Sequence, residues 1–573
     1  MKDITVLGIH FWFDAGAAII KNGRVLAAIN EERLRNIKHY TGYPLESIKE
    51  VLKISKIHPS EIDAIAIEGI TTGPFPKAWQ QYPGFSDMFF QWSWINKNSH
   101  GISLLNSYNN NFSKISKIKN LLKQLEIPLK KIIFVEHHLA HAASAYYLSP
   151  WNLDEKVLVF TSDGDGDGFS NTVNIAHKGE IELVKDSETP YFDSLGKALF
   201  AQISSLLGMK GGEHAGKVMG LAPYGKSELC IDQIKQIIRI NRNNNLQFEN
   251  TMGIAYRDLQ IRIRELLIGN RFDNIAAATQ QWFEELIVDW VKNAIKKTGI
   301  HKIACSGGNF QNVKANQKIL ALEEVDDAFF CPAAGDDGLA VGTALQVYFR
   351  LAFEDGSKPE KIPLVGSYFG SSFSDEDIEK SLKKNDLLGK AEKYDDIDGI
   401  VGELLLKDSN IVARFSGRTE WGPRALGNRS ILANPSEFSI TRKINQAVKK
   451  RDFWMPFAPS ILESRMPDYV INPKNSPYMI ISFDTTEKRN EMSGAIHPYD
   501  LTCRPQTVSS EYNPGYEKVL KSFEAKAGIG SILNTSLNIH GFPLGNNPEF
   551  AIETFMNSSI DFLAIGSYLI KKI

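Results

Sequence analysis

The chain has 573 residues, of which 43% are hydrophobic and 23% charged, a composition typical of a globular protein with several domain-sized units. Its net charge is −2, so no overall basic field would recruit nucleic acid or an anionic membrane. The four cysteines form no Cys-x-x-Cys pair, and neither a membrane span nor a signal peptide stands out. We therefore expect a soluble, cytoplasmic protein.

Two segments share a pattern of strands around an acidic, glycine-containing turn. The first has strands at 4–9, 17–20 and 25–29 and a turn at 14–16, and the second has strands at 157–160, 172–176 and 180–184 and a turn at 163–168. Such turns let a carboxylate and the backbone approach a phosphate–metal group. The repetition predicts a duplicated domain that resembles the actin-like ATPases. Two unrelated Asp-Gly hairpins are the alternative.

A histidine motif, residues 136–141, follows the apolar run 132–135 and precedes small residues that suit a tightly packed helix. On one helix His137 and His141 lie four residues apart and share a face, where two imidazoles can hold one metal ion. The motif lacks the glutamate of a zinc-protease helix. Two ordinary buried or capping histidines are the alternative.

Other loops offer weaker signals. Lys217, in the glycine-rich segment 211–225, could meet a phosphate or a ribose, with an ordinary loop as the alternative. Gly307-Gly308 joins a short strand to a helix, an arrangement common in nucleotide sites. Asp336 and Asp337 open the next helix, where a carboxylate could be a third or fourth metal ligand or could only cap the helix. Residues 274–298 have the spacing of a core helix. The aromatic-rich stretch 71–112 could line an acceptor pocket or form a satellite core.

A polar, turn-rich segment at 354–361 predicts a linker to a second region, about 365–573. Basic residues gather there on Gly- and Pro-containing loops among aromatic residues: Arg414, Arg418, Arg424, Arg429, Lys449, Lys450, Arg451 and Arg504. Guanidinium groups bind phosphate or carboxylate in a bidentate manner. This pattern predicts an anion site, with solvated surface charge as the alternative.

Several strings together resemble one family. They include HHLAHAASAYY (137–147), SDGDGDG (162–168), GKVMGLAPYG (216–225), PAAGDDGLAVGTAL (332–345), GRTEWGPRALGNRSILANP (417–435), PFAPSIL (456–462), RPQTV (504–508) and NTSLNIHG (534–541). Their order resembles that of the nodulation-protein-U type of O-carbamoyltransferase, known from antibiotic and lipo-oligosaccharide tailoring. The resemblance spans essentially the whole chain.

The resemblance implies an α/β fold of two domains. Residues 1–355 would form an actin-like, metal- and nucleotide-binding domain that transfers carbamoyl to a hydroxyl. Residues 365–573 would form a YrdC-like α+β domain that makes carbamoyl-adenylate from carbamoyl phosphate and ATP with Mg. The metal would be divalent, typically Fe(II), and the acceptor a small metabolite or sugar. A membrane or nucleic-acid partner is not expected, and a homodimer is left open.

The resemblance also assigns site residues. The metal ligands would be His137, His141, Asp163 and Asp336. The transfer site would include Asp14, Lys38 and His39, and the nucleotide would meet Lys217, Gly307, Gly308 and Asn312. Arg418 and Arg504 would act in adenylate formation, and Arg424, Lys449, Arg451, Asn534, Thr535 and Ser536 would bind its substrates.

Two positions depart from the family pattern. Phe13 stands where relatives usually carry a histidine, so the usual base is missing; either His10 or His39 could substitute for it, or the acceptor could need less help. Met455 stands where many relatives carry an arginine, and Lys450 or Arg451 could supply that charge. The first departure keeps open a relative that acts on a nitrogen or other unusual acceptor. A tRNA-modifying transferase and a non-enzymatic actin-like assembly protein are further alternatives.

Overall fold

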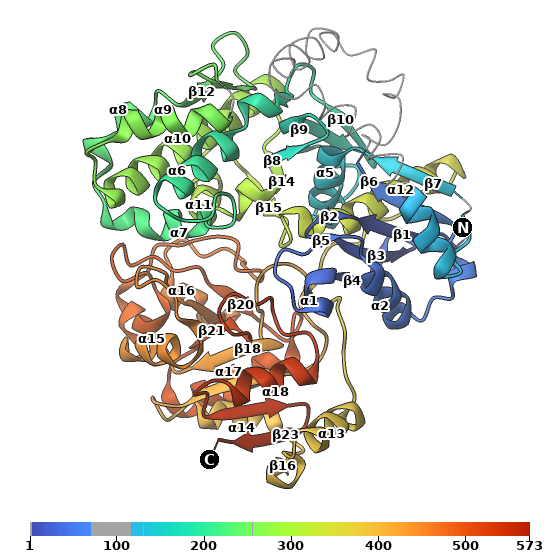
Figure 1. Ribbon diagram of the computed structural model, residues 1–573, viewed down its shortest axis with the longest axis vertical. Coiled ribbons are helices and arrows are strands. Elements are labelled where there is room, and N and C mark those ends of the chain that lie inside the picture. Colours follow the sequence, from blue (N-terminus) through green and yellow to red (C-terminus); the bar gives the residue numbers. More distant parts are fainter. Residues whose placement is uncertain (1–2, 70–115, 130, 255, 573) are drawn as a thin grey trace.

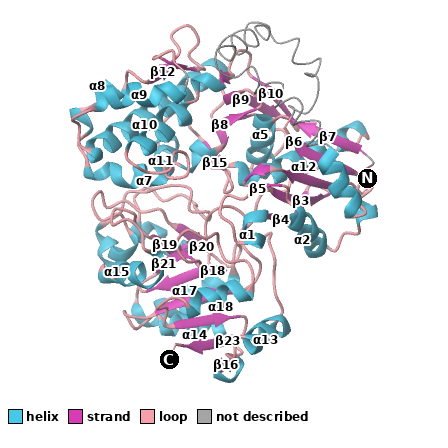
Figure 2. Cartoon of the chain, viewed as in Figure 1, coloured by secondary structure: helices cyan, strands magenta, loops and turns pink. Residues whose placement is uncertain are grey.

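The computed structural model describes residues 3–69, 116–129, 131–254 and 256–572 (Figure 1). The aromatic-rich stretch 71–112 lies outside these residues. None of the helices that the structure describes combines the length and the apolar character needed to cross a bilayer. The described elements alternate helices and strands around three main sheets (Figure 2).

The first sheet has five strands in the order β4-β3-β1-β6-β7. Their bounds are Thr5–His10 (β1), Gly16–Lys21 (β3), Arg24–Asn30 (β4), Ala64–Glu68 (β6) and Lys131–Val135 (β7). β1, β3 and β4 are antiparallel neighbours, whereas β6 and β7 run parallel to β1. A separate two-residue ribbon pairs β2 (Trp12–Phe13) with β5 (Thr41–Gly42). Two helices follow β4, at Glu31–Arg35 (α1) and Leu45–Ser55 (α2).

The second sheet repeats this plan in the order β10-β9-β8-β14-β15. Its strands are Val157–Gly166 (β8), Phe169–His177 (β9), Glu180–Leu183 (β10), Lys302–Ser306 (β14) and Asp327–Phe330 (β15), with Thr189–Pro190 (β11) beside β9. Again three antiparallel strands are followed by two parallel ones. The shared topology confirms the predicted duplication.

The predicted acidic turn at 163–168 was wrong in its extent. β8 continues to Gly166, and the turn itself is Asp167–Gly168, where φ is 48° and 97°. The pairing of β8 with β9 is irregular between Ser162 and Gly166. Because the ladder is interrupted there, Asp163 lies in a strand segment that is only loosely tied to its neighbour.

The second sheet carries most of the helices of this region. They are Gln202–Leu206 (α6), Ala215–Leu221 (α7), Ile231–Ile234 (α8), Tyr256–Leu267 (α9), Phe272–Thr298 (α10) and Val313–Leu320 (α11). A short ribbon joins Ile238–Ile240 (β12) to Phe248–Asn250 (β13). The core helix predicted at 274–298 is confirmed as α10, and its Trp290 is fully buried.

Two helices occupy equivalent places in the repeat and pack against each other. His137–Leu148 (α5) follows β7, and Leu339–Glu354 (α12) follows β15. Small side chains line the contact, including Ala140 on α5 and Ala344 on α12. A Cβ atom added to Gly342 would lie 2.0 Å from the carbonyl oxygen of Ala140. Glycine at 342 therefore sets how closely the two helices approach.

The C-terminal region forms an eight-stranded mixed sheet in the order β16-β23-β22-β17-β18-β21-β19-β20. Its strands are Ala391–Lys393, Ile411–Phe415, Arg429–Ala433, Ala458–Leu462, Gln506–Val508, Ser531–Ser536, Phe562–Ile565 and Tyr568–Lys571 (β16 to β23). Its helices are Asp375–Lys384, Ile397–Leu404, Ser439–Ile444, Met466–Tyr469, Pro514–Ala527 and Pro548–Met556 (α13 to α18). Figure 1 shows this sheet below the two N-terminal sheets.

Direct contacts join the C-terminal region to both N-terminal sheets. The buried Arg33 of α1 donates to the Gly422 carbonyl at 2.5 Å, and Arg418 donates to the Leu26 carbonyl of β4 at 2.8 Å. On the other side, Lys217 of α7 forms an ion pair with Asp452 at 3.0 Å. The predicted boundary near 354–361 falls after α12, where the chain runs without helix or strand to α13.

Replacing Gly342 with alanine should destabilise the protein, because the new methyl group meets backbone rather than a flexible side chain. Overpacking of this kind costs about 1–3 kcal/mol. We expect a lower melting temperature for Gly342→Ala than for the matched control Gly389→Ala, whose added Cβ meets nothing within 4 Å. Equal melting temperatures would contradict this account of the α5–α12 contact.

Candidate functional site

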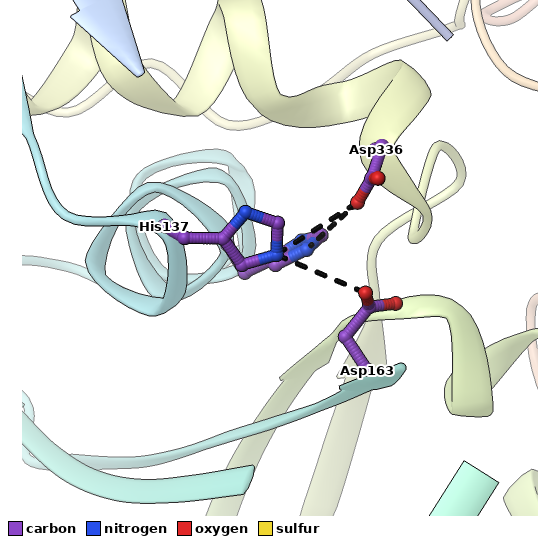
Figure 3. A group of neighbouring side chains, drawn as sticks. His137, Asp163 and Asp336 are labelled. Atoms are coloured by element: carbon purple, nitrogen blue, oxygen red, sulfur yellow. Dashed lines mark ion pairs between the residues drawn. The ribbon is translucent and has the colours of Figure 1, made fainter. Parts of the chain in front are cut away.

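Four side chains from three parts of the chain converge beside α5. His137 begins α5 and His141 lies one turn later, Asp163 comes from β8, and Asp336 comes from the turn before α12. One ligand atom from each residue lies within 4.8 Å of all the others. Figure 3 shows His137 directed toward both Asp163 and Asp336. The spacing of His137 and His141 therefore does bring two imidazoles to one point, together with two carboxylates.

The distances suit a shared ion better than direct hydrogen bonds. His137 Nε2 lies 3.8 Å from both Asp163 Oδ2 and Asp336 Oδ1, and His141 Nε2 lies 3.6 Å from Asp336 Oδ1. Ligands that each lie about 2.0–2.2 Å from one ion are separated by about 3–4 Å. His137 Nε2, His141 Nε2 and Asp336 Oδ1 are buried and find no hydrogen-bond partner among the described residues. Two imidazoles and two carboxylates fit a divalent transition metal such as Fe(II) or Zn(II).

Without a bound cation, burial and mutual repulsion shift the pKa values of these side chains far from their ordinary values. Burial and then repulsion from Asp163 raise the pKa of Asp336 to about 8. Burial and the charge of His137 lower the pKa of His141 to about 3. Burial opposes the charge of His137, but the nearby Asp163 and Glu68 carboxylates raise its pKa well above the ordinary value. A bound cation would replace these shared protons.

Glu68 and His10 lie beside the four candidate metal ligands His137, His141, Asp163 and Asp336, which we call the metal group. The sequence interpretation missed Glu68 and considered His10 only as a possible base. Glu68, the last residue of β6, accepts from His137 Nδ1 at 2.8 Å and contacts His10 Nδ1 at 3.0 Å. Burial disfavours the charge of Glu68, yet these two histidines hold its pKa well below the ordinary range. Because Nδ1 of His137 donates its hydrogen to Glu68, Nε2 is left as the nitrogen that can bind a metal ion, and it lies on the side of Asp163 and Asp336. A carboxylate ending the apolar strand AIAIE was the available signal.

Two of the predicted transfer residues are in contact: Asp14, between β2 and β3, and His39, just before β5. His39 Nδ1 lies 3.0 Å from Asp14 Oδ1, and the ring of His39 stacks on Phe13 with a centroid distance of 5.2 Å. Lys38, the third predicted transfer residue, is exposed beside this pair. The backbone carbonyls of Asp14 and Asp337 both accept from Asn30 Nδ2, at 2.9 and 3.3 Å. The pair therefore adjoins the turn that carries Asp336.

The predicted nucleotide loop lies next to the metal group. The Gly308 amide donates to Asp163 Oδ1 at 2.6 Å, and Gly307 adopts a φ of 105° against the backbone of Ser162. Asn312 uses its side chain to cap α11 and to pair with Gln280. In the structure as described, the Asn312 side chain therefore stabilises the loop and the start of α11. Lys217 is engaged with Asp452, as described above.

Three arginines of the C-terminal region form a cluster without carboxylate partners among the described residues. Burial, and then the charges of Arg424 and Arg451, hold the pKa of Arg504 well below its ordinary value. Burial, and then the charge of Arg424, lower the pKa of Arg451 to about 10. Arg451 also donates to Thr535 Oγ1 at 2.9 Å. Three mutually repelling guanidinium groups of this kind are suited to bind a multiply charged anion. We call Arg424, Arg451 and Arg504 the arginine cluster.

Other predicted anion-binding residues have mainly structural contacts. Arg418 donates to the carbonyls of Leu26, Phe369 and Gly370, and the fully buried Arg429 donates only to backbone carbonyls. Lys449 donates to Ser536 Oγ at 3.1 Å and to Asn538 Oδ1 at 2.6 Å. These groups shape the loops around the arginine cluster.

Two further buried residues contact the loop that follows Arg424. The amide nitrogen of Asn534 donates to Ser460 Oγ at 3.1 Å and Gln506 Oε1 at 3.2 Å, whereas its buried Oδ1 has no partner among the described residues. Glu420, which the sequence interpretation missed, accepts from the amides of Leu426, Asn428 and Arg429 at 2.8–3.0 Å. It thereby fixes the loop that presents Arg424.

Comparison with known families decides what these two centres belong to. Residues 5–345 match the family described as "Carbamoyltransferase N-terminus", and residues 404–572 match "Carbamoyltransferase C-terminus". The chain belongs to the carbamoyltransferase family. It is therefore an enzyme of that family, as the sequence motifs predicted. The metal group lies within the N-terminal match, and the arginine cluster lies within the C-terminal match.

Relatives of this carbamoyltransferase cover almost all of its length. A Methanocaldococcus jannaschii protein is 30% identical over 99% of this chain and 100% of its own length. Nodulation protein NolNO of Sinorhizobium fredii is 31% identical over 98% of this chain and 79% of its own length. Nodulation protein U of Azorhizobium caulinodans is 25% identical over 93% of both chains. Among solved structures, full-length HypF covers 61% of this chain at 14% identity, with a TM-score of 0.37.

Metal affinity should rise with pH, because the ligands must lose protons before they bind. We expect the apparent affinity for Fe²⁺ or Co²⁺ to increase as pH rises through the raised pKa values of Asp336, about 8, and of His137. Equilibrium dialysis at a series of pH values measures this. His141→Ala should weaken binding at every pH, whereas the exposed control His301→Ala should not. An affinity independent of pH would contradict the proposed ligand set.

Glu68→Gln should weaken metal binding without abolishing it. The amide cannot take the place of a carboxylate that holds both His137 and His10, so we expect an affinity lower by about 10–100-fold. The exposed control Glu228→Gln should bind as the parent protein does. The same dialysis measures both variants. A Glu68→Gln protein with unchanged affinity would show that Glu68 does not position His137.

Proposed function

We propose that this carbamoyltransferase is an ATP-dependent O-carbamoyltransferase that works in two steps. The C-terminal region, which we propose is YrdC-like, would join carbamoyl phosphate and ATP into carbamoyl-adenylate. The N-terminal region would transfer the carbamoyl group to a hydroxyl of a small metabolite or sugar. One observation carries the proposal: a group of candidate metal ligands and an arginine cluster without carboxylate partners among the described residues occur on a single chain.

The arginine cluster is the candidate adenylation site. Carbamoyl phosphate and ATP are both anions, so their approach is opposed by repulsion. Arg424, Arg451 and Arg504 would offset that charge, and their own mutual repulsion would be relieved on binding. The buried side-chain carbonyl oxygen of Asn534 has no hydrogen-bond donor among the described residues, and a carbamoyl NH₂ group would be a suitable donor. Catalysis would then consist mainly of positioning and charge neutralisation.

The metal group is the candidate transfer site. A divalent ion held there, which we propose is Fe(II), would neutralise phosphate charge and polarise the mixed anhydride. His137, His141, Asp163 and Asp336 would hold it, while the Gly308 amide fixes Asp163. Gly307 and Gly308 would bring the backbone close to the nucleotide.

The two candidate sites are close to each other. Asp337, next to the ligand Asp336, raises the pKa of Arg424 against the lowering effect of burial. Arg424 thus belongs to the arginine cluster and is also within electrostatic reach of the turn that carries Asp336. A cavity of about 350 Å³ lies between α7 and residues 452–454, lined by Met209, His214, Lys217, Phe272, Asp452 and Trp454. Its volume is in the range of small-molecule sites, and we propose it as space for the acceptor.

Separate losses in the two sites would test the division of labour. Incubation with carbamoyl phosphate, ATP and Mg²⁺ should release pyrophosphate. Arg504→Ala should reduce that release by about 10²-fold or more, whereas His141→Ala should retain it and lose carbamoyl transfer. The exposed control Arg442→Ala should behave as the parent protein. The reverse pattern, or no pyrophosphate with any divalent metal, would overturn the proposal; carbamoylated amines among the products would identify a nitrogen acceptor instead.

A further inference from the structure

Asp14, between β2 and β3, and His39, just before β5, form an imidazole–carboxylate pair outside the metal group. The ribbon of β2 and β5 pairs Phe13 with Thr41, and the Ala15 amide donates to the Tyr40 carbonyl at 3.3 Å. This pairing holds Asp14 beside His39. Backbone contacts on both sides of the pair therefore bring Asp14 and His39 together, in addition to the contact between their side chains.

The backbone at this pair adopts a conformation that is uncommon for residues other than glycine, although aspartate and histidine adopt it more often than most. Asp14 has a φ of 55° and His39 a φ of 53°, both in the left-handed region. Such strain persists only where the surroundings enforce it, and it collects at functional sites. Glu32 of α1 contributes, because its Oε2 accepts from the His39 amide at 3.0 Å. Three segments thus cooperate to place one imidazole.

The geometry leaves one ring nitrogen of His39 available. Nδ1 donates to Asp14 Oδ1 at 3.0 Å, which makes Nε2 the acceptor nitrogen of the neutral ring. Nε2 forms no hydrogen bond with the residues that the structure describes. The two side chains keep exposures of 26% for His39 and 15% for Asp14, so the pair can be reached by a substrate. Phe13 covers one face of the ring by stacking, which excludes water from that side.

From this arrangement we propose that His39 is the general base for the acceptor, with Asp14 as its positioning residue. The proposal rests on the proposed function. The acceptor oxygen would attack the carbonyl carbon of carbamoyl-adenylate while its proton passes to His39 Nε2. The new carbamate C–O bond forms, the bond from that carbon to the phosphate oxygen breaks, and AMP leaves with the electron pair. The imidazolium then returns its proton to water, so no oxidant or further reactant is needed.

The charges around His39 suit this role. Burial opposes the imidazolium, but the hydrogen bond and charge of Asp14 raise the pKa of His39 above the ordinary value, with Lys38 lowering it and Glu32 raising it. The ring is therefore a better proton acceptor than a free imidazole, provided that the pH lies above its pKa. Transfer should thus fall as pH drops through that pKa. Asp14→Asn should move this acid limb to lower pH.

Two variants at position 39 test the base without removing the turn. Asparagine and glycine both tolerate the positive φ, and asparagine can still donate to Asp14. The assay uses carbamoyl phosphate and ATP with glycerol or water as probe acceptors, and follows pyrophosphate for adenylate formation and AMP for its consumption. We expect His39→Asn to keep pyrophosphate release in the first turnover and to lower AMP release by about 10²–10⁴-fold. Added imidazole should restore AMP release in His39→Gly. The exposed control His301→Asn should match the parent protein.

Each other outcome counts against the base. Unchanged AMP release in His39→Asn, or a pH profile that Asp14→Asn does not move, would overturn it. Loss of a bound divalent ion in His39→Asn would show that Asp14, Glu32 and His39 hold a cation instead. Equal losses of pyrophosphate and AMP would place His39 in adenylate formation or folding. A parent protein that releases no pyrophosphate would overturn the proposed function itself, and the base with it, so the two failures are distinguishable.

Discussion

The site depends on the close contact between α5 and α12. These helices follow the last strand of each repeat, and the small side chains along their interface let the backbones approach. α5 carries His137 and His141, and the turn before α12 carries Asp336. Dispersion and burial at this contact therefore hold in place polar groups that would otherwise repel or lack partners. The apolar packing is the condition under which the metal group can exist.

The two proposed centres have opposite electrostatic character. One gathers carboxylates with imidazoles around a position for a cation, and the other gathers guanidinium groups around a position for an anion. Each centre stores unfavourable charge that its ligand would relieve. Asp337 and Arg424 lie where the two meet. That adjacency suits a charged intermediate made in one centre and used in the other.

The arginines of the C-terminal region show why residue type does not settle a role. Arg424, Arg451 and Arg504 are near one another and lack carboxylate partners among the described residues. Arg418 and Arg429 belong to the same sequence motif as Arg424, yet they donate to backbone carbonyls. A loop that turns sharply exposes several carbonyls, and a guanidinium group with five donors can satisfy many of them. The same chemical property thus serves folding at one position and anion binding at another.

The sequence by itself determined much of this protein. Alternating strands and acidic turns predicted the duplicated sheets, the spacing of His137 and His141 predicted one shared helix face, and ordered motifs across the chain predicted the family. These are properties of local periodicity, turn chemistry and residue spacing, which act over short distances along the chain.

Only the tertiary structure decided which distant side chains meet. It joined Glu68 to His137, placed Asp14 against His39, and separated the arginine cluster from the arginines that bind carbonyls. It also extended β8 through Asp163, where sequence chemistry had indicated a turn. Such pairings depend on strand order and helix packing, which no local pattern in the chain specifies, because the partners are separated by long stretches of sequence.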